Sequence, residues 1–133
     1  MARKIIIAED DEQIRSFLAS YMRDVKGLDI EVCENGEQLL EKIANTKYDL
    51  ILTDNDMPRM GGIEAIKVIR ESDKNIPIYL MSGQATEEDA LQAGANGYLH
   101  KPFNIRDLDG IVEALNPAQQ NSQSNYEQQN SSD

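Results

Sequence analysis

Five short apolar segments recur along the first hundred residues. They lie at residues 4–8, 29–33, 50–53, 78–81 and 98–100. The segments at 4–8 and 50–53 show no alternation with polar side chains, which is typical of strands buried on both faces of a sheet. The segment at 29–33 is less apolar, as expected of a strand nearer the sheet edge. The pattern predicts a largely parallel sheet.

Each strand segment is followed by apolar side chains three or four positions apart, the spacing of an amphipathic helix. In the first helix, which should end near Gly27, the apolar positions are Ile14, Phe17, Leu18, Tyr21, Met22 and Val25. Asp11 and Asn104 can cap the first and last helices, and Thr86 with Asp89 forms a capping box for a short fourth helix.

Five strands alternating with five helices over short connections predict an α/β domain, a doubly wound parallel sheet with helices on both faces. This domain should occupy residues 1–116. Residues 117–133 are mostly Gln, Asn and Ser. They cannot bury enough apolar surface to offset the entropy of ordering, so we expect a disordered tail or linker.

Composition narrows the function classes. The net charge of −11 argues against nucleic acid as a direct partner. No apolar run approaches the roughly 20 residues of a membrane-spanning helix, and no signal peptide is recognisable. Cys33 is the single cysteine, which excludes an internal disulfide and suits a reducing compartment. We therefore expect a cytoplasmic protein that binds no membrane.

The stretch from Asp49 to Gly62 organises the chain. Its apolar run stops abruptly at Asp54, and turn-forming residues follow before a helical pattern begins at Ile63. In open α/β sheets, ligands bind just beyond the carboxyl ends of the strands. Asp54 therefore lies where a reactive group would lie, although a simple strand-ending role is the plainer interpretation of this residue alone.

Polar side chains follow four of the predicted strands and should meet at one edge of the sheet. They are Glu9, Asp10, Asp54, Ser82 with Gly83, and Lys101. Three carboxylates so close together raise one another's pKa unless a positive charge neutralises them. Mg²⁺, with Mn²⁺ as an alternative, is favoured because it binds oxygen ligands and acts beside phosphate. The Lys101 ammonium suits a phosphoryl oxygen.

Taken in this order on successive βα units, the residues resemble the response regulator receiver domain of two-component signalling, a family that includes the chemotaxis regulators. The resemblance covers roughly residues 3–115. It rests on the acidic pair after the first strand, Asp54 with Met57-Pro58 and Gly62, Ser82-Gly83, and Lys101-Pro102-Phe103. It implies a flavodoxin-like strand order, 2-1-3-4-5, and a protein that is not an enzyme in the usual sense.

The resemblance implies that Asp54 accepts a phosphoryl group, in a Mg²⁺-dependent reaction, from a sensor histidine kinase or a histidine phosphotransfer protein. The implied metal ligands are Asp10, Asp54, the backbone carbonyl of Asp56 and, through water, Glu9. The implied phosphoryl-binding groups are Lys101, the Ser82 hydroxyl and the backbone amides of Asn55 and Gly83.

The family's switch couples the hydroxyl at position 82 to an aromatic side chain, here Tyr98, and changes an output face that binds a downstream protein. Three features depart from the family pattern. Ser82 replaces the commoner Thr. Asp56 is acidic and can repel the phosphoryl donor or hydrolytic water, which leaves the phosphoryl lifetime open. The segment from Gly83 to Gly94 is about one helical turn short, so the fourth helix is short or irregular. We assign His100 no role.

Other interpretations stay open at this point. Asp54-x-Asp56 after an apolar strand resembles the nucleophile motif of haloacid-dehalogenase-type phosphatases, although there it normally follows the first strand. A flavodoxin-like electron carrier would need a phosphate-binding loop after the first strand, and none is present. The Gln/Asn/Ser tail resembles a linker, so the chain could be a receiver fragment of a larger regulator or hybrid kinase. Our first choice is a stand-alone receiver that is monomeric or weakly dimeric.

Overall fold

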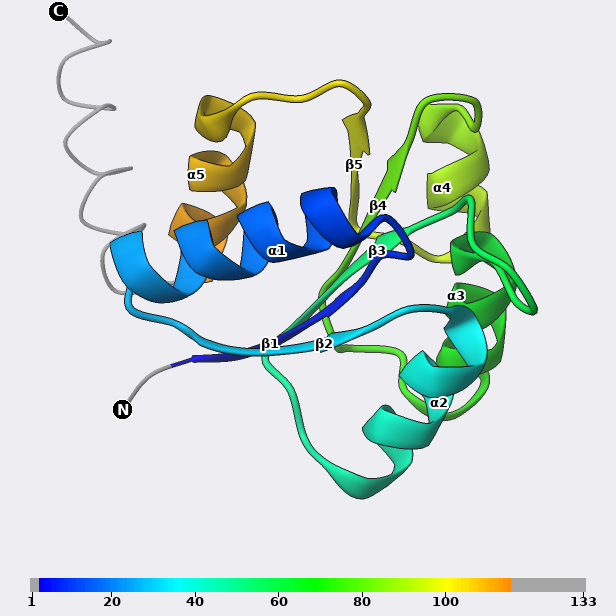
Figure 1. The fold of residues 1–133 in the computed structure, drawn as a ribbon. Coiled ribbons are helices and arrows are strands. Elements are labelled where there is room, and N and C mark those ends of the chain that lie inside the picture. Colours follow the sequence, from blue (N-terminus) through cyan, green and yellow to red (C-terminus); the bar gives the residue numbers. More distant parts are fainter. Residues whose placement is uncertain (1–2, 116–133) are drawn as a thin grey trace, which may run out of the picture. The chain divides into compact units, whose positions relative to one another are not determined.

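The computed structural model describes residues 3–115, which form a five-stranded parallel sheet with accompanying helices (Figure 1). The strands are β1 (Lys4–Ala8), β2 (Asp29–Cys33), β3 (Leu50–Asp54), β4 (Ile78–Ser82) and β5 (Gly97–His100). The α-helices are α1 (Glu12–Ser20), α2 (Gly36–Asn45), α3 (Gly62–Ser72), α4 (Glu87–Ala93) and α5 (Ile105–Ala114). The strand order is β2-β1-β3-β4-β5, which confirms the predicted α/β fold.

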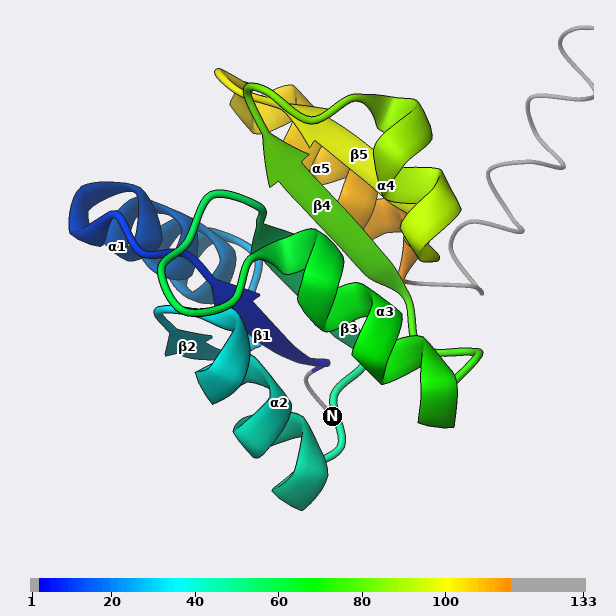
Figure 2. The ribbon, with the colours of Figure 1, turned by 90° about the vertical axis from the view of Figure 1, so that its right-hand side faces the viewer.

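Helices cover both faces of the sheet. Helix α1 lies on one face, and α2, α3 and α4 lie together on the other (Figures 1 and 2). The core of the second face joins Ile6, Ile51 and Leu80 of the strands to Leu39 of α2 and Ile66 of α3. Strand β3 is central and buried at every position. Its burial on both faces explains the unbroken apolar run in the sequence.

The last described helix belongs to a second unit of the chain, which begins at Phe103. Within it, Asn104 and Asp107 form a capping box at the start of α5. The predicted boundary between residues 116 and 117, and the predicted tail at 117–133, lie outside the described residues. None of the helices described is long and apolar enough to cross a membrane.

The first helix differs from its predicted pattern. Leu18 and Met22 are buried, but Phe17 is 50% exposed and Val25 is 63% exposed. A surface helix buries only one stripe of side chains, and Leu18 and Met22 occupy that stripe here. Phe17 and Tyr21, one position before them, therefore lie on the flank of the helix. There the rings of Phe17 and Tyr21 stack, 6.3 Å apart. The helix also widens into a five-residue π-turn, η1 (Tyr21–Val25), before it ends at Gly27 with φ of 70°.

The fourth helix is regular. Thr86 and Asp89 form the predicted capping box, and the seven-residue helix ends at Gly94 in the left-handed conformation, with φ of 114°. The structure confirms the prediction that this helix is short. It is a regular α-helix, so the alternative of an irregular segment is wrong. Cys33 is buried, as expected of a packed thiol, and burial raises its pKa to about 11.

Candidate functional site

The strand register brings the predicted site residues to one edge of the sheet. Ala8 of β1 pairs with Thr53 of β3, so Glu9 and Asp54 follow side by side. Asp54 pairs with Met81 of β4, which places Ser82 one position further along. Ser82 pairs with His100 of β5, immediately before Lys101. The four strand ends therefore converge, as the sequence predicts for a parallel sheet.

A single ammonium group joins two buried carboxylates at this edge. Lys101 Nζ lies 2.8 Å from Glu9 Oε1 and 2.9 Å from Asp54 Oδ1. Glu9 and Asp54 are almost completely buried, whereas the Lys101 side chain is 21% exposed. The contact with Glu9 is a hydrogen bond. The contact with Asp54 is an ion pair without hydrogen-bond geometry, and Asp54 Oδ1 is buried with no hydrogen-bond partner.

The pKa directions at the site follow from burial. Burial raises the pKa of Asp54 above its ordinary value, and the Lys101 ammonium offsets this only in part. Burial likewise raises the pKa of Glu9, and the charge of Asp54 adds to the effect. Burial alone would lower the pKa of Lys101, but its hydrogen bond to Glu9 and its contact with Asp54 outweigh burial and raise it. One ammonium therefore does not fully balance the negative charge here.

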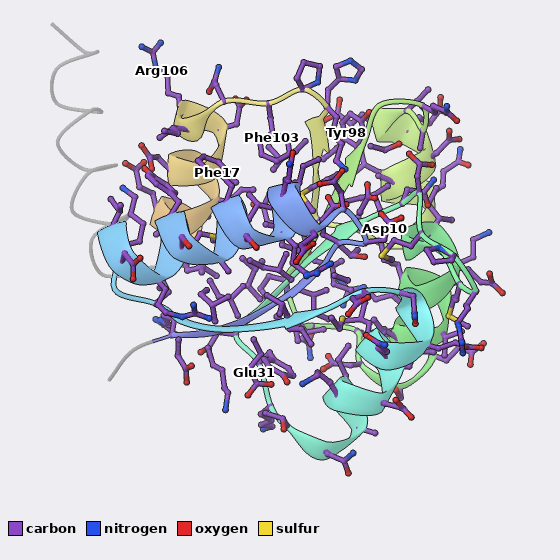
Figure 3. All side chains as sticks on the ribbon, viewed as in Figure 1. Asp10, Phe17, Glu31, Tyr98, Phe103 and Arg106 are labelled. Atoms are coloured by element: carbon purple, nitrogen blue, oxygen red, sulfur yellow. The ribbon has the colours of Figure 1, made fainter. Side chains whose placement is uncertain are left out.

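Three carboxylates at this edge are grouped closely enough to hold one cation. Oxygen atoms of Glu9, Asp10 and Asp54 lie within 4.8 Å of one another. Asp10, in the turn between β1 and α1, is exposed, and Figure 3 shows it well away from Glu31 of β2. Oxygen donors suit a hard divalent cation such as Mg²⁺. The lack of a hydrogen bond to Asp54 Oδ1 and the excess negative charge also fit such an ion.

Ser82 is the last residue of β4, and Tyr98 of β5 reaches the loop between β4 and α4 through its hydroxyl. The Ser82 side chain is fully buried, and its Oγ accepts hydrogen bonds from the backbone N–H groups of Gln84 and Ala85, at 3.1 and 2.9 Å. The Tyr98 hydroxyl lies 2.6 Å from the Ala85 carbonyl oxygen and 2.8 Å from that of Ser82. Both side chains therefore contact the backbone of the same short loop.

The remaining predicted site residues differ in their contacts and in their exposure. The Asn55 backbone N–H donates to the Met81 carbonyl, at 2.9 Å, so this amide is already engaged. Gly83 lies beside Lys101, since a Cβ built on Gly83 would be 3.7 Å from the Lys101 carbonyl oxygen. Asp56 is exposed, and its charge acts to raise the pKa of both Asp54 and Tyr98.

Two side chains at this edge carried no distinctive sequence signal. His100 Nδ1 lies 3.2 Å from the Tyr98 hydroxyl, a contact that only the alternation of β5 could have suggested. Arg15 of α1 donates to the carbonyl oxygens of Glu9 and Asp10. An arginine on the first helix has no distinguishing spacing, so only the three-dimensional structure identifies this contact.

Comparisons with known proteins agree with this geometry. The family model described as the response regulator receiver domain matches residues 5–113. A transcriptional regulatory protein of Haemophilus influenzae, a CpxR homolog, is 33% identical over 115 residues, which are 84% of this chain and 49% of that protein. This chain thus spans about half the length of curated regulatory proteins such as this one.

Solved structures give the same result. The receiver domain of a Francisella response regulator is 31% identical, with a TM-score of 0.78 that covers 85% of this chain and 95% of that one. The receiver domain of a sensor histidine kinase of Pseudomonas aeruginosa is 28% identical, with a TM-score of 0.76, covering 86% of this chain and 98% of that one. That structure has a magnesium ion coordinated in its active-site cleft.

Proposed function

Because this chain belongs to the response regulator receiver domain family of two-component signalling, a family of signalling modules rather than conventional enzymes, we propose that it accepts a phosphoryl group on Asp54. The donor is a phosphohistidine of a sensor histidine kinase or of a histidine phosphotransfer protein. The observation that supports this most directly is the buried Asp54 carboxylate, held 2.9 Å from the Lys101 ammonium beside Glu9 and Asp10.

The proposed reaction is a single phosphoryl transfer. A carboxylate oxygen of Asp54 attacks the phosphorus, and the bond between phosphorus and the donor imidazole nitrogen breaks. The electron pair of that bond stays with the nitrogen, and because the other ring nitrogen of the donor carries a proton, a neutral histidine is left on the donor. Such transfers are accelerated mainly by positioning and by neutralisation of charge on the phosphoryl oxygens.

The proposed neutralising groups are a cation and two side chains. Asp10 and Asp54 would bind Mg²⁺ directly, with the Asp56 carbonyl as a further ligand and Glu9 acting through water; the ion would supply positive charge to the phosphoryl oxygens. Lys101 supplies a second positive charge. Ser82 accepts both of its observed hydrogen bonds, so its own O–H can donate to a phosphoryl oxygen together with the Gly83 amide. The Asn55 backbone N–H could bind the phosphoryl group only after its hydrogen bond to the Met81 carbonyl breaks.

The proposed output depends on the loop between β4 and α4. If the Ser82 side chain turns to bring its hydroxyl to the phosphoryl group, its Oγ moves away from the backbone N–H groups of Gln84 and Ala85. Tyr98 contacts the same loop through Ala85 and would respond. We propose that this change alters the binding of a downstream protein.

The setting of the domain is also a proposal. The P. aeruginosa neighbour is a receiver domain of a sensor histidine kinase, and the H. influenzae relative is a transcriptional regulatory protein. This chain could therefore act alone, as a monomer or weak dimer in the cytoplasm, or as the receiver part of a larger regulator or hybrid kinase.

Incubation with acetyl phosphate tests the chemistry. With Mg²⁺ present, we expect the intact mass of the wild-type protein to rise by one phosphoryl group, and we expect no rise after chelation or in Asp54→Ala. The matched control is Asp24→Asn, which changes an exposed carboxylate and should be phosphorylated normally. A mass gain in Asp54→Ala equal to that of the wild type would overturn the proposal.

Turnover separates the proposal from its enzyme alternative. A haloacid-dehalogenase-type phosphatase would hydrolyse p-nitrophenyl phosphate repeatedly, whereas a receiver should show essentially no turnover. Sustained release of p-nitrophenol by the purified protein, lost in Asp54→Ala, would favour the phosphatase.

A further inference from the structure

Among the described hydrogen bonds, Arg15 provides the only ones from a side chain of α1 to the turn that contains Glu9 and Asp10. It lies one helical turn after the N-terminal cap, Asp11. Its Nη1 donates to the carbonyl oxygen of Glu9, at 3.0 Å, and is 3.3 Å from that of Asp10. The proposed phosphoryl transfer gives this guanidinium no part.

The two carbonyl groups that Arg15 contacts determine where Asp10 points. The Glu9 carbonyl belongs to the peptide plane before the Asp10 Cα, and the Asp10 carbonyl belongs to the plane after it. Peptide units are planar, so anchoring one atom of each plane restricts the two backbone dihedrals of Asp10 and therefore the directions that its Cβ can take. The Asp10 side chain is exposed and lacks a surrounding core that could hold it. The guanidinium supplies that constraint from the rigid helix.

Other contacts hold the rest of the turn. The Glu9 N–H donates to the Cys33 carbonyl, at 3.0 Å, and the Asp11 N–H donates to Glu9 Oε2, at 3.2 Å. These bonds fix the turn on either side of Asp10 and orient the Glu9 carboxylate. Arg15 completes the set at the residue between them.

We propose that Arg15 is a positioning residue for the cation site: by holding the Glu9 and Asp10 carbonyls, it keeps the Asp10 carboxylate turned toward Asp54. The inference rests on the proposed function, because it concerns the same cation site. It extends that proposal to a residue that contacts neither the cation nor the phosphoryl group.

The sign of the effect distinguishes positioning from charge. Arg15 carries a positive charge near a site for a cation. If charge were its only influence, replacing it with a neutral residue would strengthen Mg²⁺ binding by removing repulsion. If Arg15 positions Asp10, the same replacement weakens Mg²⁺ binding in spite of the lost repulsion. The two roles therefore predict opposite shifts of the dissociation constant.

The test is a titration of the metal-free protein with Mg²⁺ alone, followed by heteronuclear NMR. Loss of residues that orient metal ligands typically lowers metal affinity 10–100-fold, so we expect about tenfold weaker binding in Arg15→Gln. Arg15→Lys should lie between it and the wild type, because its ammonium has enough N–H groups for both carbonyl oxygens but sits on a more flexible and more strongly hydrated side chain than the guanidinium. The matched control is Arg23→Gln, which removes a guanidinium bond to the Ile30 carbonyl, away from the site, and should bind Mg²⁺ as the wild type does.

The Mg²⁺ dependence of phosphorylation distinguishes a loss of Mg²⁺ affinity from general damage to the fold. In the acetyl phosphate reaction, Arg15→Gln should need about tenfold more Mg²⁺ for half-maximal phosphorylation, yet reach the wild-type rate at saturating Mg²⁺. Should Arg15→Gln fail to fold, Arg15→Lys replaces it as the test, because it keeps the charge and weaker Mg²⁺ binding then indicates positioning. Unchanged or tighter Mg²⁺ binding in the Arg15 variants overturns this inference and leaves the proposed function standing. Absence of Mg²⁺ binding by the wild type overturns the proposed function itself.

Discussion

Replacing Lys101 with methionine should lower the free energy of unfolding of the metal-free protein by about 3 kcal/mol, the scale expected when a buried ion pair loses one partner. Methionine keeps the length of the side chain but removes the ammonium that lies 2.8 Å from Glu9 and 2.9 Å from Asp54. Both carboxylates are buried, and burial already raises the pKa of each. Without Lys101 they would face each other uncompensated.

Mg²⁺ should reverse part of this loss. A cation bound by the same carboxylates stabilises the folded state in proportion to its affinity, and without the competing ammonium that affinity should rise. Urea unfolding with chelator and with saturating Mg²⁺ measures both effects. The control is Lys67→Met, on the exposed side of α3, which should change stability by no more than about 0.5 kcal/mol. Equal stability of Lys101→Met and the wild type in chelator would contradict the ion-pair account.

Replacing Gly62 with alanine should destabilise the fold by about 3 kcal/mol, the upper end of the usual cost of overpacking. Gly62 is the first residue of α3 and packs directly against β3. A Cβ there would lie 2.3 Å from the Asp54 carbonyl oxygen and 2.7 Å from Leu80 Cδ1. The oxygen belongs to the backbone of Asp54, the proposed phosphoryl acceptor, so the strain can be relieved only by moving Asp54 or the helix. We therefore also expect slower phosphorylation by acetyl phosphate.

Gly110 of α5 provides the matched control. It is also a helical glycine, but a Cβ on it would meet nothing within 4 Å. Alanine is the better helix former, so Gly110→Ala should stabilise by about 0.5–1 kcal/mol. Thermal and urea unfolding of the two variants should thus shift in opposite directions. A Gly62→Ala protein as stable as Gly110→Ala would show that the close packing of α3 on Asp54 is not a constraint.

The sequence predicts the architecture well because its signals are local. Unbroken apolar runs require burial on both faces, and cap residues such as Thr86 and Asn104 mark helix starts directly. Convergence of Glu9, Asp54 and Lys101 then follows from the geometry of any parallel sheet.

The sequence does not predict what depends on orientation around a helix or a strand. Apolar periodicity could not tell that Phe17 lies on the flank of α1 while Leu18 lies beneath it. The contact of Arg15 with Glu9 and Asp10, and that of His100 with Tyr98, involve side-chain directions that residue spacing does not encode. These contacts surround the predicted site residues.

Locating the transferred phosphoryl group tests the central claim most directly. Borohydride reduces an acyl phosphate to an alcohol, so treatment of the acetyl phosphate-reacted protein should convert a phosphorylated aspartate to homoserine. Peptide mass mapping should then find homoserine at position 54, only in protein that was treated with acetyl phosphate and Mg²⁺. Homoserine at position 10 or 56 instead, or none in a protein that binds Mg²⁺, would contradict the assignment of Asp54 as the phosphoryl acceptor.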